Sequence, residues 1–488
     1  MEILEKYRKY VDLVELRVDF LDPDERFHIR RFPEMAGFPV ILTIRRGIEG
    51  GHSAGGEGAR ITLLAKGLAY AVADKRRNFA YVELEGDLEV PSLEEAARAF
   101  GTRIIRSWHN MEGVGEDLAG KIKKLRRVGD ELVKVTVMPK SLDDVTKVYR
   151  AAKETVDVDK IILCMGEYSA NTRILAEVLG SRFSYTSPGG EDELMQAGQL
   201  DPKVMTELYR FREINADTMI FGVSGYPLKV TESPRVFNPA FSMEHINAVY
   251  VPIPADSIRS LVGLADEIGI LGISITVPYK EDILPYLAHK SSEVNSIGAC
   301  NTILREPHGW VGYNTDTAGF SDSLLTFMGS YMNIKDFRRR KITIVGAGGS
   351  AKAVASEVHR LRGKALILNR TMARARSLAE PYRFKWAGFD GRGAELIEKY
   401  SDIIIQTTSA GMEPNVDEDP LGFYKFSGKE TVMDLIYKPE KTVCLKRAEK
   451  AGCRIINGSD MLFRQARIQY SYFVNREFPI SLMSKIKL

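Results

Sequence analysis

The runs LVELRVDF at residues 13–20 and ELVKVTVMP at residues 131–139 decide the fold class of roughly the first two hundred residues. In each run apolar and polar side chains alternate, which is the pattern of a β-strand with two different faces. Glu15 and Arg17 share the polar face of the first run, and Lys134 lies on the polar face of the second. A doubly wound sheet tolerates few charges within its strands, whereas a closed barrel can direct them towards a ligand inside it. We therefore predict an α/β protein that begins with a (β/α) barrel of the TIM type.

About seven β-rich runs alternate with charged, helix-like stretches from residue 11 to about residue 202, as expected for β-α units around a parallel sheet. They are DLVELRVDF, PVILTIR, FAYVELEGD, RIIRSWH, ELVKVTVMP, KIILCMG and RFSYTSPG. A TIM barrel has eight strands, so this count is one short. Because the chain begins within what reads as the first helix, we expect the first barrel strand to be missing or replaced.

The composition of the chain is that of a globular protein with more than one domain. The 488 residues are 44% hydrophobic and 27% charged, and the net charge of +3 is too small to favour nucleic acid or an anionic membrane as a partner. The cysteines are too dispersed for a zinc or redox motif, so we predict reduced thiols and no metal. They are Cys164, Cys300, Cys444 and Cys453. The sequence shows neither a signal peptide nor a membrane span, so we expect a cytoplasmic protein that acts on small molecules.

Ionisable side chains lie on the inward faces of five predicted strands: Glu15, Arg17, Arg45, Glu83, His109 and Lys134. Burying so many charges is costly unless they pair with one another or with a polar ligand. A lysine held among cations and apolar walls is more often neutral, and a neutral amine can attack a ketone to form a Schiff base. We therefore predict Lys134 as the nucleophile and His109 as its acid-base partner. The alternative is an ion-pair ladder of Glu15, Arg17 and Asp19 that only stabilises the barrel.

These residues resemble the type I 3-dehydroquinate dehydratases, which are barrels with a Schiff-base lysine. The shared motifs are ELRVD, TIRRGIEGG, SWH, VKVTVMP, MGEYSANTR and AGQ. The resemblance implies that Lys134 forms an imine with the C3 ketone of 3-dehydroquinate, that His109 moves protons, and that Glu49 supports His109. It also implies substrate contacts by Glu15, Arg17, Arg45, Arg173 and Gln199.

Two positions depart from the pattern of this family. Tyr81 stands where an aspartate is usual, and Met195 stands where a small polar residue often precedes AGQ. Both departures weaken the expected substrate contacts but leave the argument for Lys134 unchanged.

In the second half of the chain, a lysine and an aspartate each follow an apolar run. Lys280 ends SITVPYK, and Asp316 ends GYNTD. Such residues commonly serve as turn or capping residues. Beside a nicotinamide, however, a lysine paired with an aspartate can donate a proton or hydrogen bond to a carbonyl while the hydride arrives.

A glycine-rich turn follows a short apolar strand in KITIVGAGGSAKAVA at residues 341–355. Gly346, Gly348 and Ala351 fit the G-x-G-x-x-G/A pattern, which lets the backbone approach a pyrophosphate at a helix N-terminus. The next strand-like run ends at Asn369, Arg370 and Thr371 with Arg374 nearby, where an acidic residue would bind the ribose of NAD. Since a cation there favours a 2′-phosphate, we predict a Rossmann domain that binds NADP. The alternative is a turn that serves only close packing.

From Ile220 onward the chain resembles the shikimate dehydrogenases. The shared motifs are GVSGYPLKVTESP, SITVPYK, GACNT, GYNTD, GAGGSAKA, NRT, TTSAGM, DLIYKPEKT and NGSDMLFRQA. The resemblance implies that Lys280 and Asp316 are the catalytic pair. The substrate contacts that it implies are Thr231, Ser233, Thr276, Asn301 and Gln465, with Thr231 and Val230 departing from the common serine and histidine. It adds Gly349 and Gly458 to the cofactor-binding residues.

Together the two resemblances predict a bifunctional enzyme of aromatic amino acid biosynthesis, which performs consecutive steps of the shikimate pathway. We expect a dehydratase barrel over residues 1–212, a substrate-binding domain over 219–335, a Rossmann NADP domain over 336–456 and a helical segment over 457–488 that returns to the substrate domain. Two alternatives remain: a first half that only binds metabolites in a regulatory role, and a quinate dehydrogenase. The sequence contains no indication of the oligomeric state.

Overall fold

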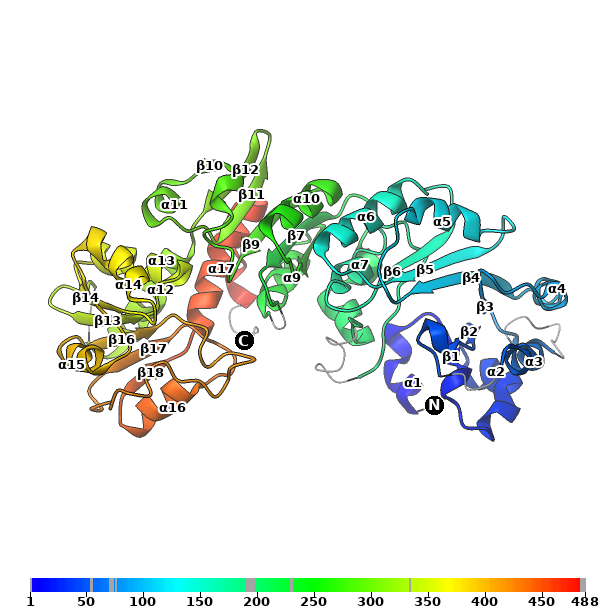
Figure 1. The fold of residues 1–488 in the computed structure, drawn as a ribbon, viewed down its shortest axis with the longest axis horizontal. Coiled ribbons are helices and arrows are strands. Elements are labelled where there is room, and N and C mark those ends of the chain that lie inside the picture. The colour runs from blue at the N-terminus through cyan, green and yellow to red at the C-terminus, as the bar shows by residue number, and fades with distance from the viewer. Residues whose placement is uncertain are drawn as a thin grey trace. The chain divides into compact units, whose positions relative to one another are not determined.

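The computed structural model describes residues 2–52, 56–69, 74, 77–189, 198–228, 231–332 and 335–482 and contains three six-stranded sheets (Figure 1). The chain divides into two compact units. The first consists of Met1–Ile220, Pro227–Lys229 and Asn247–Gly269, and the second of Phe221–Tyr226, Val230–Ile246 and Ile270–Leu488.

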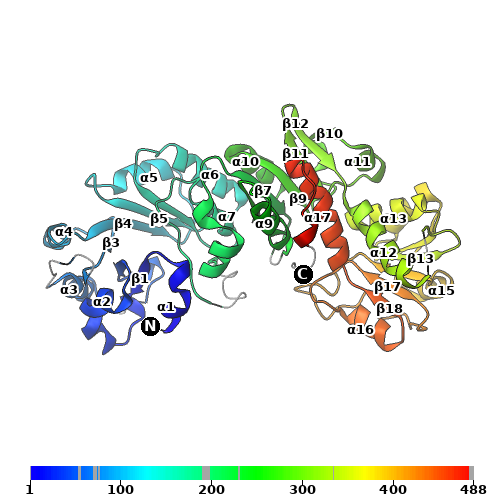
Figure 2. The same ribbon diagram turned by 180° about the vertical axis from the view of Figure 1, so that it is seen from behind.

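The first sheet is parallel, and its strands pair in the order of the sequence. They are β1 (Val14–Arg17), β2 (Val40–Thr43), β3 (Tyr81–Glu85), β4 (Arg103–Asn110), β5 (Leu132–Val137) and β6 (Lys160–Cys164). The sheet is curled, and the helices of this part of the chain are seen from both sides in Figures 1 and 2. They are α1 (Glu2–Tyr7), α2 (Phe32–Ala36), α3 (Glu57–Leu68), α4 (Pro91–Ala99), α5 (Leu118–Leu125), α6 (Leu142–Lys153) and α7 (Ala170–Ile174).

The two faces of this sheet have the polarity that the strand pattern predicts. Leu16 and Val18 belong to a core cluster with Val40, Leu42 and Val82, which lie on the same, helix-covered face. The opposite face carries an apolar layer beside the polar side chains that surround Lys134. The apolar layer comprises Leu13, Ile41, Tyr81, Ile105, Leu132, Ile161 and Leu163, with Phe183 and Tyr185 packed against it. The inward direction predicted for Lys134 is therefore confirmed.

The run RFSYTSPG, which we predicted as a seventh strand, is not one. Ser181 forms only an isolated bridge to Lys160, and Arg182 N donates a hydrogen bond to Lys160 O at 2.8 Å. The next residues leave the sheet because the aromatic rings of Phe183 and Tyr185 turn into the apolar layer instead. Within the described part of the chain no strand pairs with both β1 and β6, so the sheet stays open there.

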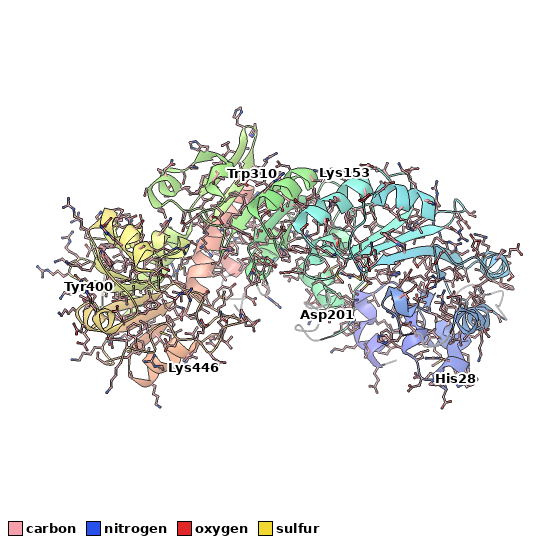
Figure 3. All side chains as sticks on the ribbon, in the orientation of Figure 1. His28, Lys153, Asp201, Trp310, Tyr400 and Lys446 are labelled. Atoms are coloured by element: carbon pink, nitrogen blue, oxygen red, sulfur yellow. The ribbon has the colours of Figure 1, made fainter. Side chains whose placement is uncertain are left out.

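The second sheet is mixed and has the order β10-β12-β11-β9-β7-β8. Its strands are β7 (Met219–Ser224), β8 (Ala248–Pro252), β9 (Ile270–Ile275), β10 (Leu287–Lys290), β11 (Thr302–Glu306) and β12 (Gly309–Tyr313), with helices α9 (Ser233–Met243), α10 (Ile258–Ile268) and α11 (Ser292–Ile297). Trp310 of β12, labelled in Figure 3, is buried and has the Arg305 guanidinium 5.0 Å from its ring centroid.

The third sheet is parallel throughout, with the order β15-β14-β13-β16-β17-β18. Its strands are β13 (Lys341–Val345), β14 (Lys364–Leu368), β15 (Lys385–Ala387), β16 (Ile403–Gln406), β17 (Thr431–Asp434) and β18 (Arg454–Ile456). Separate apolar clusters cover its two faces, so the predicted Rossmann architecture is confirmed. Its helices are α12 (Asp316–Met332), α13 (Gly349–Arg360), α14 (Met372–Ala379), α15 (Gly391–Lys399) and α16 (Val443–Lys450). The last long helix, α17 (Ser459–Val474), packs against α12 and α9 and contacts β9 and β11 of the second sheet.

Candidate active sites

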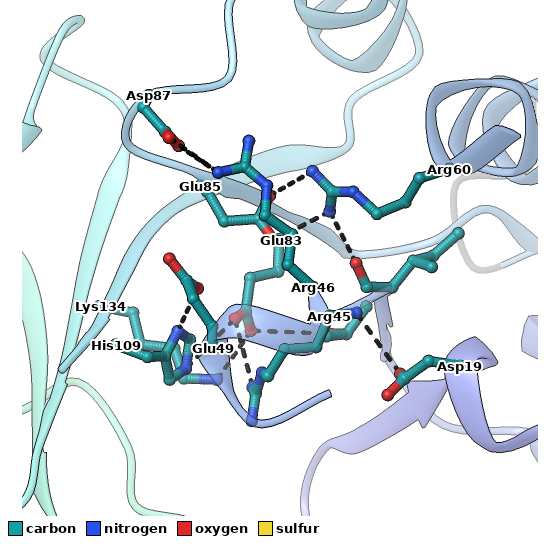
Figure 4. A network of polar contacts seen from close by, with 12 residues as sticks. Asp19, Arg45, Arg46, Glu49, Arg60, Glu83, Glu85, Asp87, His109 and Lys134 are labelled. Carbon is teal, nitrogen blue, oxygen red and sulfur yellow. Dashed lines mark hydrogen bonds and ion pairs between the residues drawn. The ribbon is translucent and has the colours of Figure 1, made fainter. Parts of the chain in front are cut away.

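Lys134 belongs to a polar network inside the first sheet (Figure 4). Its side chain is 2% exposed, and its Nζ lies 2.7 Å from Glu83 Oε2 of β3 and 3.6 Å from Glu15 Oε1 of β1. The same Nζ lies 4.2 Å from the ring centroid of Tyr185. The amine is therefore held between two carboxylates and the electron-rich face of an aromatic ring.

The expectation that Lys134 is held among cations is wrong. The carboxylates of Glu83 and Glu15 contact its Nζ, and Arg45 joins the network through Glu83 at 3.3 Å and Glu15 at 3.7 Å. Strand alternation placed all these residues on one face but could not rank the distances between them. Repulsion by neighbouring cations is therefore not what prepares this amine for reaction. The structure instead places a buried proton acceptor, Glu83, within contact distance of it.

His109 lies two residues beyond Ser107, the residue opposite Lys134 on the neighbouring strand β4. Its Nδ1 is 2.9 Å from Glu49 Oε2, and its Nε2 is buried and has no hydrogen-bond partner. Glu49 ends a short turn in which Gly50 has φ +78°, a conformation that favours glycine. The turn thus aims the carboxyl at one ring nitrogen and leaves the other nitrogen able to take a proton.

Burial controls the charges of this pair. Burial and the nearby Arg45 charge hold the pKa of His109 well below its usual value. Burial, together with the negative charge of Glu85, raises the pKa of Glu49 to about 7. Near neutral pH the imidazole is therefore neutral, and Glu49 can hold or release a proton, so the contact is a hydrogen bond rather than an ion pair.

The other residues proposed for this site lie around the same interior. Arg17 forms a two-pronged contact with Asp19, at 2.9 and 2.6 Å, while Glu15 accepts a hydrogen bond from Thr43 Oγ1 at 2.9 Å. The suggested ladder of Glu15, Arg17 and Asp19 is thus limited to the Arg17–Asp19 pair. Arg45 contacts Glu15 and Glu83, as described above.

Arg173 of α7 is buried without a carboxylate among its recorded contacts in the described chain. Its guanidinium donates to Tyr185 O at 3.1 Å and to Cys164 O at 3.4 Å, and its Nε has no partner. Burial lowers its pKa to about 10. A buried guanidinium with free donor capacity suits a substrate carboxylate. Gln199 follows Gly198, whose carbonyl accepts a hydrogen bond at 2.9 Å from Ser169, the residue that precedes α7.

Of the two departures from the dehydratase pattern, one can be placed. Tyr81 belongs to the apolar layer below Lys134 and meets Phe183 edge to face at 5.9 Å between centroids. An aromatic contact thus occupies the position of the usual aspartate. Met195 lies outside the described residues.

The predicted pair Lys280 and Asp316 is formed in the second unit. Lys280 Nζ donates to Asp316 Oδ2 at 2.5 Å, and Asp316 Oδ1 accepts from Asn301 Nδ2 at 2.9 Å. Asn301 also contacts Gln465 Oε1 of α17 at 3.0 Å. Asn301 holds the backbone before α12 through Thr315 N, which donates to Asn301 Oδ1 at 2.9 Å. Four predicted residues therefore form one buried network.

The glycine-rich turn lies directly against this network. Lys280 Nζ is 3.0 Å from the hydroxyl of Ser350, the second residue of α13. A Cβ on Gly349 would lie 2.8 Å from Lys280 Cβ, so only glycine lets the lysine side chain pass so close to the turn. Sequence analysis missed Ser350, because its place within the motif indicates a phosphate turn and not a contact with a lysine.

The residues around the turn fit NADP. Gly346 has φ +118°, and a Cβ on Gly348 would meet nothing within 4 Å, so the turn leaves open space at the N-terminus of α13. Gly346 N donates to Leu368 O, which brings the end of β14 beside the turn. Arg370 and Arg374 follow that strand as exposed cations with no ion pair among those recorded in the described chain. Asn369 and Thr371 complete this corner, with Asn369 Nδ2 3.0 Å from Thr371 O, while Ala351 is buried in α13.

The remaining residues predicted to bind the dehydrogenase substrate or its cofactor make mainly backbone contacts. Thr231 Oγ1 accepts from Ser233 N at 3.3 Å at the start of α9, while Thr276 N donates to Ser224 O just after β9. A Cβ on Gly458 would lie 2.0 Å from Leu435 O, so a close backbone approach already explains this glycine. Val230 lies outside the described residues.

Known protein families match successive segments of the chain, in the order of the predicted domains. The family model for type I 3-dehydroquinase matches residues 1–216, that for the shikimate dehydrogenase substrate-binding domain matches 223–303, and that for shikimate/quinate 5-dehydrogenase matches 330–419. A shikimate dehydrogenase (NADP(+)) of Caldanaerobacter subterraneus subsp. tengcongensis is 36% identical over 54% of this chain and 93% of its own length. The chain belongs to the shikimate dehydrogenase family, joined to a type I 3-dehydroquinase domain.

Two further matches support this membership. The bifunctional 3-dehydroquinate dehydratase/shikimate dehydrogenase of Arabidopsis thaliana, a chloroplastic protein, is 29% identical over 97% of this chain and 79% of its own length. A solved shikimate dehydrogenase in complex with NADP+ is 34% identical, with a TM-score of 0.50 over 56% of this chain and 95% of its own. The predicted pairing of the two enzyme classes, the fold class and NADP as cofactor are confirmed. No described helix of this dehydratase/dehydrogenase chain is long and apolar enough to cross a membrane.

Proposed function

We propose that the chain dehydrates 3-dehydroquinate to 3-dehydroshikimate in its first sheet and reduces 3-dehydroshikimate to shikimate with NADPH in its second unit. The observation that carries this proposal is the presence of two separate buried lysine-carboxylate centres, each with the surroundings that its reaction needs. Lys134 has an acceptor for its proton and a neutral histidine nearby. Lys280 has an aspartate partner beside a dinucleotide turn.

For the dehydratase half, the amine of Lys134 attacks the ketone and forms an imine, which makes the hydrogens on the adjacent carbon acidic. The free Nε2 of His109 takes one of these protons and returns it to the hydroxyl that leaves as water. Glu49 holds the ring by its other nitrogen. Arg173, Gln199, Glu15, Arg17 and Arg45 bind the carboxylate and hydroxyl groups of the substrate.

For the dehydrogenase half, NADPH supplies the hydride, and we assign its pyrophosphate to Gly346, Gly348, Gly349 and Ala351. Arg370 and Arg374, with Asn369 and Thr371, would bind the 2′-phosphate. Gly458 is the last of the predicted cofactor-binding residues. Lys280 donates a proton to the carbonyl oxygen while Asp316 holds the ammonium. Thr231, Ser233, Thr276, Asn301 and Gln465 bind the substrate hydroxyls and carboxylate.

Two single variants test the proposal in one coupled reaction that supplies 3-dehydroquinate and NADPH. The wild-type chain is expected to consume NADPH with either 3-dehydroquinate or 3-dehydroshikimate as the starting compound. Lys134→Ala should consume NADPH only with 3-dehydroshikimate, and Lys280→Ala should accumulate 3-dehydroshikimate without consuming NADPH. A wild-type chain that does not dehydrate 3-dehydroquinate would leave the first half as a binding module.

The matched family model is described as shikimate/quinate 5-dehydrogenase, so quinate is the second candidate substrate. Oxidation of shikimate and quinate by the same preparation decides between them. Faster oxidation of shikimate supports the proposal, and faster oxidation of quinate identifies a quinate dehydrogenase.

We place the protein in the cytoplasm, a reducing compartment, because all four cysteines are buried as free thiols. We also retain residues 1–212, 219–335, 336–456 and 457–488 as functional segments. Support for the last segment is that Gln465 and Gln469 of α17 contact Asn301, which brings this helix back to the substrate residues.

A further inference from the structure

Glu83 lies between the two residues to which the dehydratase chemistry is assigned, and no role has been given to it. Its side chain is 4% exposed and uses both oxygens. Oε2 accepts a hydrogen bond from Lys134 Nζ at 2.7 Å, while Oε1 lies 3.3 Å from Arg45 Nη2 and 3.7 Å from His109 Nε2 (Figure 4). Glu83 is therefore at the centre of the network and in direct contact with the nitrogen that reacts.

An ammonium group cannot attack a ketone, so Lys134 must lose a proton before it forms a bond to substrate. The described groups facing Nζ are Glu83, Glu15 and the Tyr185 ring. Glu15 is farther away, at 3.6 Å, and already accepts a hydrogen bond from Thr43. Among the recorded contacts, His109 approaches the lysine through Glu83, and Arg45 approaches it through Glu83 and Glu15. Among the described groups, Glu83 alone is a carboxylate within hydrogen-bond distance of the amine.

We propose that Glu83 is a catalytic base in the first half reaction and takes the ammonium proton of Lys134 as the substrate ketone arrives. This inference deepens the proposed function and rests on it. The N–H bond breaks, an O–H bond forms on Oε2, and the freed nitrogen electron pair forms the C–N bond. The π electrons of the carbonyl move to its oxygen.

The proton then leaves with water. The tetrahedral adduct first carries a positive nitrogen and a negative oxygen, and transfer of one proton from nitrogen to oxygen gives a neutral hydroxyl. Protonated Glu83 gives its proton to that hydroxyl as the C–O bond breaks. Water departs, the nitrogen forms the protonated imine, and Glu83 is again a carboxylate beside a positive nitrogen. Charge and protons balance without another reactant.

The charge state of Glu83 supports this role. Burial raises its pKa, but the positive charges of Lys134 and Arg45 outweigh burial and hold the pKa below the usual range. Glu83 is therefore ionised before substrate binds and can accept a proton. A substrate group that engages Arg45 weakens one of these attractions and makes Glu83 a stronger base at the moment of attack.

A competing role is that Glu83 only stabilises the ammonium. The two roles predict opposite effects of Glu83→Gln, which keeps size and hydrogen bonding but removes the charge. A stabilising carboxylate slows attack, so its loss would speed imine formation at neutral pH. A catalytic base is required at neutral pH, so its loss would slow imine formation until solvent hydroxide replaces it at higher pH.

The experiment reduces the imine with borohydride in the presence of 3-dehydroquinate and measures the adduct on Lys134 by peptide mass over time and pH. We expect Glu83→Gln to form adduct at least tenfold more slowly near neutral pH and to recover towards the wild-type rate as pH rises. An equal or faster rate near neutral pH, or a loss that does not recover at high pH, would overturn the proposal.

Glu131→Gln is the matched control, because Glu131 is a buried carboxylate paired with Arg106 at 2.7 Å on the helix side of β4. Its adduct profile should follow the wild type. If Glu83→Gln does not fold, Glu83→Asp keeps the charge but shortens the reach, and it should show the same slowing with recovery; equal or faster trapping would overturn the proposal. A wild-type chain that traps no adduct would refute the proposed dehydratase mechanism, which is a different result.

Discussion

The two lysine centres use the same pair of functional groups in different surroundings. Lys134 faces carboxylates from two strands and an aromatic ring, inside the first sheet. Lys280 has one carboxylate partner, Asp316, which is itself fixed by Asn301, and a hydroxyl partner on the cofactor turn. On the proposed assignments, the first arrangement removes a proton from a nucleophile, whereas the second orients a donor. The same ion pair can thus serve covalent or hydrogen-bonding chemistry, depending on what surrounds it.

Arginine substitutions should separate the two roles most strongly. Lys134→Arg is expected to lose all dehydratase activity above background, because a guanidinium cannot form the imine. Lys280→Arg keeps a cation and a donor, so we expect a smaller loss, of about 10²-fold, in the reduction of 3-dehydroshikimate. Turnover of each half measured alone checks both values. Comparable residual activities in the two halves would contradict the distinction.

The second prediction concerns the cofactor corner, which has no counterpart in the first sheet. Arg370→Ala should weaken NADPH binding about 10- to 100-fold, as expected for one charge-assisted contact, while NADH binding changes little. Fluorescence titration with each nucleotide measures the difference, and dehydratase activity in the same preparation serves as the internal control. An equal loss for both nucleotides would show that Arg370 does not bind the 2′-phosphate.

The smallest expected effect is a pH dependence of stability that arises in the first centre. Burial raises the pKa of Glu49 from its ordinary 4.5 to about 7. Its contribution to stability is therefore fully present below about pH 4.5 and is lost as pH rises through about 7. Urea unfolding should show that Glu49→Gln stabilises the chain relative to wild type by about 1–3 kcal/mol at pH 8 and by less at pH 5. A difference that is constant with pH would argue against a buried, titrating carboxyl.

Strand alternation was sufficient to identify the inward face of the first sheet, because the period of two is strict. It therefore predicted that Lys134, Glu15, Glu83 and His109 share one interior. It could not rank their mutual distances, which depend on strand register and sheet curvature, and so the expectation of cations around Lys134 missed that two carboxylates lie next to it.

The run at residues 182–189 shows another limit. Its composition is typical of a strand. In the structure its two aromatic rings pack into the apolar layer, and its backbone does not continue the pairing that the isolated bridge at Ser181 begins. In the second unit, the motifs predicted the Lys280–Asp316 pair. Only the three-dimensional structure shows that a hydroxyl of the cofactor turn reaches the same lysine.

The aromatic rings of the apolar layer have a consequence for how substrate reaches Lys134. Tyr81, Phe183 and Tyr185 form a floor directly under the reactive amine. Because the Tyr185 ring covers one side of the amine, we expect substrate to approach Lys134 from the side of His109 and Glu49. On the proposed assignments, the residues that move protons would then also border the path of the incoming substrate and of the expelled water.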